Sequence, residues 1–599
     1  MTVEQTVDRL PLSTWRYWWA LIKCHPGLYS ATTLLRIVIF ALAFQAWGLI
    51  TRWFFDSLTN GAPMSWGPET WAALLVAAAL VRSGLILVDM YCFFAWEFSS
   101  SAIMRRNMFE RILQRPGARA LPGSTGEAIS RFREDPEEVG NFTAWALFIV
   151  AQLLFAVIAV AVMVQINVRI TIFVFIPLAL VVFIANMAMT RVQKYREASR
   201  GATGNVTGFI GEMFNSVQAI KLAVAEERVL GHFETLNEAR RQSSLKDRLF
   251  TEVLGSVYRN TTTVGAGLIM LLAGQSLQEG SFTVGDFALF VFYLGFISDW
   301  TASLGLFFPR LRQAAVALGR MNRLLQGAPP ETLVAKQPTY LRGPLPAVPY
   351  IAKAPEDALT TLTVTNLGYH FPGSEQGVTG IDLRLRRGSF TVITGRVGAG
   401  KTTLLRTLLG LLPKDAGAIC WNGDLVENPA TFMIPPRVAY TPQLPALFSE
   451  SLRDNILAGL PPDQVDLEGA LYAAVLEQDL PHLDHGLETV IGPRGVKLSG
   501  GQRQRAAAAR MFVRTPELYV FDDLSSALDV ETERRLWERL FARPGLTCLV
   551  VSHRRAALRR ADHIIVLREG RIHDQGSLEE LLQRCPEMQE LWRGDGEQD

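Results

Sequence analysis

The residues best suited to chemistry lie in a glycine-rich stretch, Gly395-Arg-Val-Gly-Ala-Gly-Lys-Thr-Thr403. Its spacing fits the pattern G-x-x-x-x-G-K-[ST], in which glycines let backbone N–H groups wrap the phosphates of a nucleotide. Lys401 is expected to reach the β- and γ-phosphates, and Thr402 to hold Mg²⁺. An apolar strand at 390–394 and a helical pattern at 403–409 flank the stretch, and a chance glycine-rich turn would lack this context. The predicted phosphate-binding residues are Gly395, Gly398, Gly400, Lys401, Thr402 and Thr403.

A second apolar strand, at 518–521, ends in two consecutive carboxylates, Asp522 and Asp523. A carboxylate at the end of such a strand suits Mg²⁺, so Asp522 is the candidate metal ligand. Asp523 is placed to orient or polarise the water molecule that attacks the terminal phosphate. An Asp-Asp pair alone could equally be a solvated turn, but its position after the phosphate-binding stretch favours the catalytic interpretation.

A third motif, Leu498-Ser-Gly-Gly-Gln502, lies between the first two and again suits phosphate contact by backbone N–H groups at a helix start. Ser-Gly-Gly-Gln between a phosphate-binding loop and an acidic strand end resembles the signature of ATP-binding cassette (ABC) proteins. In that family each ATP is sandwiched between one chain's phosphate-binding loop and its partner's signature. The resemblance therefore implies a dimer, with ATP-binding roles for Ser499, Gly500, Gly501 and Gln502.

Other elements of the cassette follow in the family's order. Gln443 resembles the Q-loop glutamine, His553 the switch histidine, and Ser526-Ala-Leu-Asp529 the D-loop. Phe371 stands where the family stacks an aromatic ring on adenine, and Tyr369 is the less favoured candidate for that stack. The resemblance implies catalytic roles for Asp523, His553 and Gln443, and a Mg²⁺ site formed by Thr402, Gln443 and Asp522.

The composition indicates what kind of chain must position these residues. It has 599 residues, of which 49% are hydrophobic and only 19% charged, so several domains and membrane spans are expected. A net charge of +2 gives no case for nucleic-acid binding, which requires a strongly basic face. The five cysteines are scattered without a CxxC pair, which supports neither a disulfide framework nor a zinc site.

Six stretches are apolar over about 20 residues, the length that crosses a hydrocarbon core of ~30 Å. Arginine and lysine concentrate in the two long gaps after spans two and four, so the positive-inside rule places both gaps and both termini in the cytosol. Helix-forming composition predicts that spans two to five continue as helices beyond the bilayer. The alternative is a small separate domain in each gap. The spans lie near 31–53, 71–95, 142–164, 169–190, 257–277 and 284–307.

The predicted fold has an α-helical transmembrane domain over residues 1–325, with an amphipathic elbow helix near 15–28. A proline-rich linker follows at 326–357, because proline removes donors that helix and sheet need. Residues 358–599 alternate strands and helices, which is typical of an α/β P-loop NTPase cassette. Motifs of the membrane half also resemble ABC exporters, so the likeness covers nearly the whole chain: 125–131, 217–226 and 282–286.

The resemblance implies a half-transporter that exports or flips a substrate across the cell membrane, with its two long loops docked as coupling helices onto the cassettes. Six fused spans argue against a soluble cassette ATPase, and importers usually keep the two parts on separate chains. A second half-transporter and membrane lipid are the expected partners. The substrate could be a small molecule, a lipid or a peptide.

Two positions depart from the family's pattern. Asp523 replaces its usual catalytic glutamate, and Pro493 replaces a glutamate that helps to couple cassette and membrane domain. Asp523 leaves open a second function, that of an ATP-binding regulatory half of a heterodimer with little hydrolysis of its own. Because the other cassette motifs are intact, a homodimer is the favoured assembly.

Charged residues inside membrane spans are costly and therefore usually functional. Arg82 lies midway along the second span, and Asp89 follows seven residues later on nearly the same helix face. Arg82 either faces the central pathway and favours an anionic or polar group on the cargo, or forms an internal pair with Asp89 or another span. Arg36 lies nearer a membrane end, where snorkelling to the interface is expected.

Overall fold

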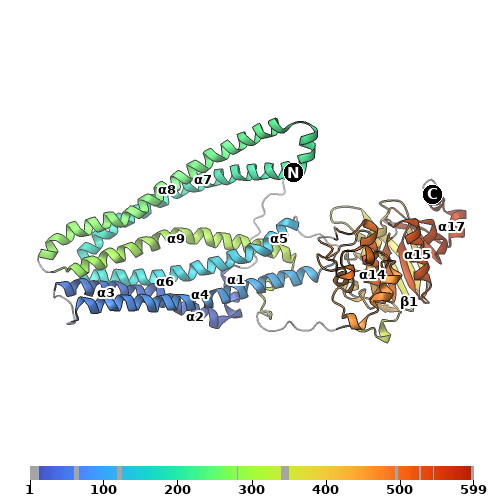
Figure 1. Ribbon diagram of the computed structural model, residues 1–599, viewed down its shortest axis with the longest axis horizontal. Coiled ribbons are helices and arrows are strands. Elements are labelled where there is room, and N and C mark those ends of the chain that lie inside the picture. The colour runs from blue at the N-terminus through green and yellow to red at the C-terminus, as the bar shows by residue number, and fades with distance from the viewer. Residues whose placement is uncertain are drawn as a thin grey trace. The chain divides into compact units, whose positions relative to one another are not determined.

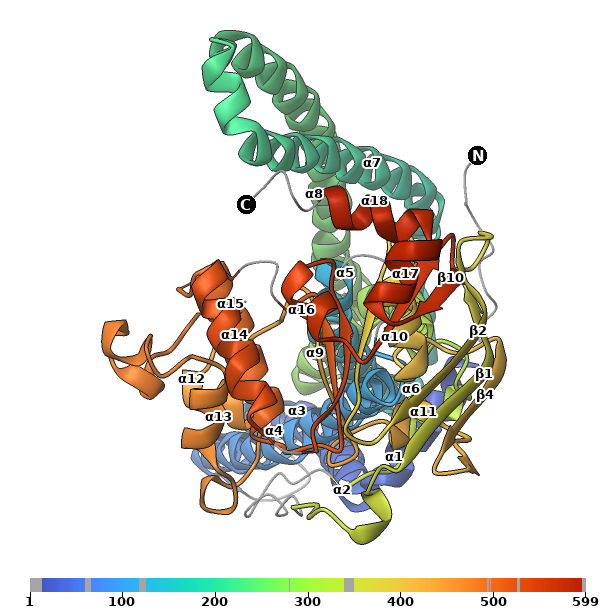
Figure 2. The ribbon, with the colours of Figure 1, turned by 90° about the vertical axis from the view of Figure 1, so that its right-hand side faces the viewer.

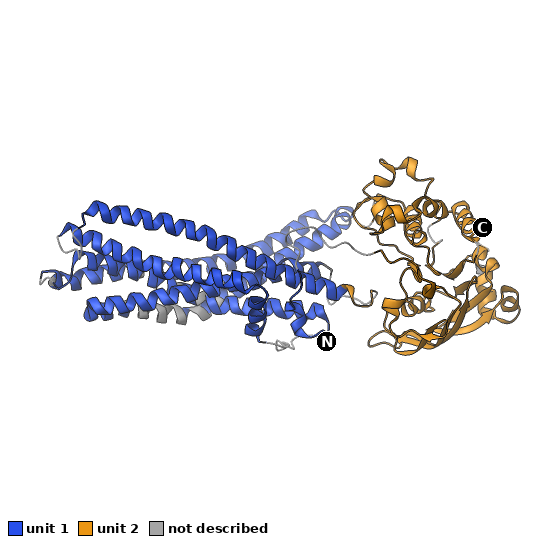
Figure 3. Cartoon of the chain, turned by 90° about the horizontal axis from the view of Figure 1, so that it is seen from below, with its two compact units in different colours: residues 1–112, 121–342 blue, residues 113–120, 343–599 orange. Residues whose placement is uncertain are grey.

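The chain divides into two compact units (Figure 3). The first comprises residues 1–112 and 121–342, and the second comprises residues 113–120 and 343–599. Within the described residues the first unit is helical, whereas the second contains both β-sheets. The computed structural model describes residues 13–59, 66–117, 125–278, 281–338, 350–492, 495, 497–524, 528–543 and 545–594.

Long helices build the first unit (Figure 1). A short helix, α1, precedes them, and a π-helical turn, η1, joins α2 to α3 in one continuous segment. The elements are α1 (Thr14–Cys24), α2 (Pro26–Ile37), η1 (Val38–Leu42), α3 (Ala43–Leu58), α4 (Pro68–Leu113), α5 (Thr125–Arg133), α6 (Asp135–Ile166), α7 (Val168–Leu222), α8 (Glu226–Gln278), α9 (Val284–Leu325) and the 3-10 turn η2 (Pro330–Val334).

All six predicted spans lie on helices of this unit. Among the described residues, four helical segments are long and apolar enough to cross a membrane: Pro26–Leu58, Pro68–Leu113, Gly126–Ile166 and Val284–Thr301. A shorter apolar stretch, Thr263–Gly274, lies in α8 where the fifth span is predicted. The predicted fourth span lies in α7, and most of its side chains fall outside the described residues.

The predicted helical extensions are present. Helices α7 and α8 run for 55 and 53 residues, well over twice the length that a bilayer requires. They lie side by side and diverge from the other helices toward the turn that joins them (Figures 1 and 2). Large apolar side chains are exposed near that turn, with Phe214 at 75%, Leu222 at 87% and Val224 at 84%. The alternative of a separate small domain in this gap is therefore wrong.

Helix α1 has the amphipathic character predicted for an elbow helix. Tyr17 and Leu21 are fully buried in a cluster with Trp96 of α4, and the Tyr17 hydroxyl accepts a hydrogen bond from Asn322 Nδ2 at 2.6 Å. Trp19, on the other face, is 57% exposed, with the Lys23 ammonium over its ring. Such a pairing of an apolar face with exposed tryptophan and lysine suits a membrane interface.

The start of the proline-rich stretch is held firmly against the helices. The amide of Asn107 in α4 donates hydrogen bonds to the carbonyl oxygens of Leu333 at 3.1 Å and Ala335 at 2.9 Å. Leu333 is fully buried, and Cys24 of α1 donates to the carbonyl of Val334. The chain that leaves α9 is thus fastened to α1 and α4 before it reaches the second unit.

Two sheets form the second unit. The antiparallel sheet has the order β2-β1-β4-β5, and the larger sheet has the order β10-β9-β3-β8-β7-β6, parallel except for β10. The antiparallel sheet lies on one side of the unit, and α12 to α14 on the other (Figure 2). The strands are β1 (Thr361–His370), β2 (Gly377–Arg386), β3 (Phe390–Thr394), β4 (Ala416–Trp421), β5 (Asp424–Leu425), β6 (Val438–Thr441), β7 (Leu518–Asp522), β8 (Thr547–Val551), β9 (His563–Arg568) and β10 (Arg571–Gly576).

Helices α10, α14, α16 and α17 pack against the larger sheet, and α12 and α13 pack on α14. The helices of the described part of this unit are α10 (Lys401–Leu408), α11 (Pro429–Phe432), α12 (Leu452–Leu457), α13 (Leu467–Ala473), α14 (Gly500–Phe512), α15 (Val530–Phe541), α16 (Arg555–Arg560), α17 (Leu578–Arg584) and α18 (Pro586–Gly594). Strands β3, β7 and β8 are buried along their whole length, as their continuous apolar sequences require of a central parallel sheet. Their carboxyl ends meet at one edge, where ligands bind in such sheets.

Candidate functional site

The glycine-rich stretch forms the turn between β3 and α10. Gly395 has a φ of 145°, and a Cβ atom there would lie 2.3 Å from the carbonyl oxygen of Leu567. Gly400 has a φ of 97° and precedes the first residue of α10. Only glycine suits these two positions, and the turn directs the N-terminus of α10 and its partial positive charge toward a bound phosphate.

Lys401 is held over this turn. Its Nζ donates to the carbonyl oxygens of Gly395 at 2.7 Å and Arg396 at 2.9 Å. Burial lowers the pKa of the Lys401 ammonium, and the nearby carboxylates of Asp523 and Asp522 act against that change. The cation is therefore fixed next to two carboxylates at the place where phosphate groups would bind.

Asp522, at the end of β7, is almost fully buried, and both of its oxygens accept hydrogen bonds. Thr402 Oγ1 donates to Oδ1 at 3.1 Å, and the Tyr440 hydroxyl donates to Oδ2 at 3.2 Å. Burial raises the pKa of the Asp522 carboxyl, and these two hydroxyl groups act against the rise. A hydroxyl and a carboxylate side by side are hard oxygen ligands, so the residues present fit a Mg²⁺ ion.

Asp523 lies beside Asp522 in a left-handed backbone conformation, with φ of 53°. Its Oδ2 accepts a hydrogen bond from Gln443 Nε2 at 3.1 Å, and its amide donates to the carbonyl of Val551. Asp is among the residues that tolerate this conformation best. The predicted catalytic carboxylate and the predicted Q-loop glutamine are thus in direct contact.

A hollow of about 910 Å³ collects most of the predicted site residues. Phe371 lies in its wall and is 41% exposed, whereas Tyr369 is buried with its ring edge-on to Phe371. Glu569 and Ser374 also line the hollow, and no sequence motif indicated them. The predicted residues in its wall are Phe371, Gly398, Gly400, Lys401, Thr402, Thr403, Gln443, Asp522, Asp523 and His553.

The signature residues stand apart from this hollow. Ser499 caps the N-terminus of α14 in a capping box with Gln502, which in turn donates to Asp479 at 3.0 Å. Gly500 and Gly501 form the first turn of α14. None of the four lines the hollow. Within one chain, the predicted ATP-binding residues therefore divide into two separate sets.

Some predicted features fall outside the described residues. Pro493 is one, and Ser526 in the predicted D-loop is another. The last residue of that loop, Asp529, is described: its side chain accepts a hydrogen bond from the amide of Thr532 and caps α15.

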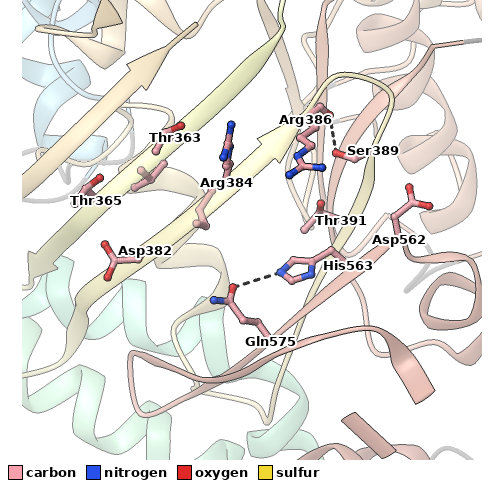
Figure 4. A pocket seen from close by; sticks show the side chains of 12 residues that line it. Thr363, Thr365, Asp382, Arg384, Arg386, Ser389, Thr391, Asp562, His563 and Gln575 are labelled. Atoms are coloured by element: carbon pink, nitrogen blue, oxygen red, sulfur yellow. Dashed lines mark hydrogen bonds between the residues drawn. The ribbon is translucent and has the colours of Figure 1, made fainter. Parts of the chain in front are cut away.

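A second hollow, of about 660 Å³, lies between the two sheets (Figure 4). It offers Arg384 and Arg386 of β2 together with Asp382 and Asp562. Asp382 accepts a hydrogen bond from the amide of Asn366, and Asp562 accepts one from the amide of Phe390. The two positive and two negative side chains balance, and no glycine-rich turn borders the hollow, so its lining does not favour a phosphate.

The charged residues of the spans pair differently from the prediction. Arg36 does not snorkel: its side chain is 10% exposed, and its Nε lies 3.3 Å from Asp89 Oδ2. It also donates to the carbonyl of Ala144 at 2.8 Å and lies over the ring of Phe93. Arg36 of α2 is buried between α4 and α6, and its partners could not be predicted because they lie far away in the sequence. Arg82 lies instead over the ring of Phe44, 4.3 Å from its centre, so the pair with Asp89, which was one of the alternatives for Arg82, is not formed.

The fold and the site together define a membrane protein with an attached ATP-binding domain. The chain matches the description "ABC transporter transmembrane region" over residues 34–299 and "ABC transporter" over residues 378–526, together more than half of its length. It thus belongs to the ABC transporter family, as a half-transporter that carries both domains on one polypeptide.

Relatives along nearly the whole chain support this assignment. The ATP-dependent lipid A-core flippase of Cupriavidus metallidurans is 27% identical over 94% of this chain and 93% of its own. The ATP-dependent lipid A-core flippase of Bordetella pertussis is 27% identical over 83% of this chain and 80% of its own. A probable multidrug resistance ABC transporter ATP-binding/permease protein of Bacillus subtilis is 27% identical over 76% of each.

The fold also matches a solved structure. A bacterial Atm1-family ABC exporter with ATP bound aligns with a TM-score of 0.71 over 94% of this chain and 98% of its own, at 22% identity. The chain is a multi-pass membrane ATPase that drives export or flipping of a substrate, and such half-transporters work as dimers. The alternative of a regulatory half with little hydrolysis is not favoured.

Proposed function

We propose that two copies of this chain form an exporter of an amphipathic lipid, with each ATP bound by one copy's hollow and closed by the other copy's signature. The division of ATP-binding residues into two sets carries this proposal. Phe371 would stack on adenine, and the turn with Lys401 would hold the phosphates. Ser499 and its neighbours, which lie apart in their own chain, would serve the partner's nucleotide.

Hydrolysis in this proposal depends on three side chains at the γ-phosphate end of the hollow. Asp523 would accept a proton from the attacking water, and Gln443 and His553 would orient that water molecule. Thr402, Gln443 and Asp522 would hold Mg²⁺, which neutralises the charge of the β- and γ-phosphates. Asp523 is one methylene shorter than the family's glutamate, so the site would be slow.

Ser499→Arg tests the sandwich. The larger cation at the start of α14 should block closure of the cassette dimer and abolish ATP hydrolysis, yet leave ATP binding to the hollow within about threefold. Crosslinking of the two cassettes with ATP present measures closure, and a fluorescent ATP analogue measures binding. Arg503→Lys, one turn further along α14, is the control. Normal closure in Ser499→Arg would exclude the sandwich for this protein.

The exposed turn between α7 and α8 suits the docking that the resemblance implies. Phe214, Leu222 and Val224 expose large apolar surfaces there, which an isolated soluble tip would not favour. We propose that this turn docks on a cassette and transmits its closure to the spans. By the positive-inside rule the turn, both termini and the cassette would lie in the cytosol, with the spans in the cell membrane.

The cargo proposal rests on Arg82 and on the relatives. Several relatives of this chain are lipid A-core flippases, which indicates an amphipathic lipid as the substrate class. Arg82 has no carboxylate partner within the described residues, and its cation lies on the ring of Phe44. An uncompensated cation within a span would favour an anionic headgroup on the cargo.

Arg82→Ala and Arg36→Ala should therefore differ. Arg82→Ala should fold and keep its basal ATPase but lose most stimulation by anionic lipid, and Arg82→Lys should retain part of it. Arg36→Ala leaves the buried Asp89 unpaired, a change that typically costs about 3–5 kcal/mol, and should lower yield and thermal stability. Lipid titration of ATPase activity and thermal unfolding separate the two effects. Misfolding of Arg82→Ala would instead assign that residue a structural role.

A further inference from the structure

Both oxygens of the Asp522 carboxylate are held by hydroxyl groups from other elements. Thr402, which binds Oδ1, comes from α10 and is itself a proposed metal ligand. Tyr440, which binds Oδ2 at 3.2 Å, comes from β6 and has no role in the proposed catalytic set. The position of this carboxylate therefore depends on a residue beyond those that would contact ATP or Mg²⁺.

Strand pairing brings Tyr440 to this position. Strand β6 runs parallel to β7, with Tyr440 opposite Val520 and Thr441 opposite Phe521, so Tyr440 lies close to the end of β7. The ring is half-buried, and it does not line the hollow. Its ring packs against the core cluster that contains Leu404 of α10, and its hydroxyl reaches Asp522 from the neighbouring strand.

A third residue acts on this hydrogen bond through its charge. Burial raises the pKa of the Tyr440 phenol, and the positive charge of Arg406 in α10 acts against that rise, as it does for the pKa of the Asp522 carboxyl. A guanidinium carries no proton acceptor, so the phenol proton is left for Asp522, to which the Tyr440 hydroxyl donates. Arg406 thus supports the hydrogen bond between Tyr440 and Asp522.

We infer that Tyr440 is a positioning residue: its hydroxyl fixes the Asp522 carboxylate beside Thr402 in the orientation that holds Mg²⁺. Groups that orient metal ligands in this way typically change metal affinity by about 10–100-fold when they are removed. Phenylalanine at 440 keeps the ring and removes only the hydroxyl. This inference rests on the proposed role of Asp522 as a metal ligand.

The test measures binding of a fluorescent ATP analogue to the purified full-length chain, first in EDTA and then in rising Mg²⁺. Tyr440→Phe should leave the Mg²⁺-free affinity within about twofold and raise the Mg²⁺ concentration for half-maximal effect about tenfold. Tyr519→Phe is the matched control, because this tyrosine lies on β7 and is buried between the rings of Phe512 and Phe521. Its Mg²⁺ dependence should equal that of the native chain.

Two further variants make every outcome decisive. Arg406→Gln should shift the Mg²⁺ dependence in the same direction by a smaller factor and add little to Tyr440→Phe, and it replaces that variant if the latter does not fold. Asp522→Asn tests the underlying metal role. If Asp522→Asn shifts the Mg²⁺ dependence and the Tyr440 and Arg406 variants do not, the inference is wrong; if Asp522→Asn has no effect, the proposed metal site itself fails.

Discussion

Lys401→Ala should reduce ATP hydrolysis by at least about 10²–10³-fold. The ammonium is fixed above the phosphate-binding turn by the carbonyl groups of Gly395 and Arg396, next to the carboxylates of Asp522 and Asp523. Removal of a positioned electrostatic group of this kind typically costs two to three orders of magnitude in rate. Phosphate release from ATP by the purified variant measures the effect.

The same variant should retain its helical unit. Its thermal unfolding and its elution as a dimer should match those of the native chain, since the two hydrogen bonds of the Lys401 ammonium go to carbonyl groups of its own loop. Lys414→Ala is the control: this lysine donates to the carbonyl of Gly417 and does not line the hollow. Hydrolysis by Lys401→Ala at the native rate would remove the assignment of the phosphate-binding loop.

Asp523→Asn should abolish nearly all turnover, because general bases typically contribute about 10²–10⁴-fold. Asparagine keeps the size of the side chain and can accept from Gln443, but it cannot take a proton from water. ATP binding should persist. Loss of less than about tenfold would show that Asp523 is not the catalytic carboxylate and would direct attention to Gln443 and His553.

Asp523→Glu should raise turnover, because it restores the reach that the shorter side chain lacks. A carboxylate displaced by about 1 Å can cost on the order of 10²-fold, which sets the upper limit of the gain. Glutamate tolerates the left-handed backbone at this position less well than aspartate, so some stability should be lost. A decrease in turnover with the fold intact would mean that the site is built around the shorter side chain.

The cassette was predictable because the residues that would bind and hydrolyse ATP lie in short contiguous motifs. A glycine-rich stretch after an apolar strand and two carboxylates after another must meet, because carboxyl ends of parallel strands share one edge of the sheet. The contact of Gln443 with Asp523 could not be read in this way, since it joins residues 80 apart in a loop and a strand end. The position of Tyr440 beside Asp522 depends on the pairing of β6 with β7, which the sequence motifs do not specify.

The membrane unit was predictable in its helices and not in its side-chain partners. Hydropathy and charge indicated six long segments, and helix-forming composition indicated their extensions; both signals are local and need no tertiary information. The pair of Arg36 with Asp89 depends on which faces of α2, α4 and α6 meet, and hydropathy does not specify this. In a lone helix, an arginine near a membrane end reaches the interface. Arg36 does not, because three helices pack around it and supply partners for its side chain.

The ATPase activity of the native chain, purified alone in lipid nanodiscs, tests the proposed homodimeric exporter most directly. We expect a homodimer by mass and a slow hydrolysis that requires Mg²⁺ and is lost in Lys401→Ala. A chain that binds ATP but shows no turnover alone, and hydrolyses it only after a different half-transporter is added, would contradict the homodimer and make this chain the regulatory half.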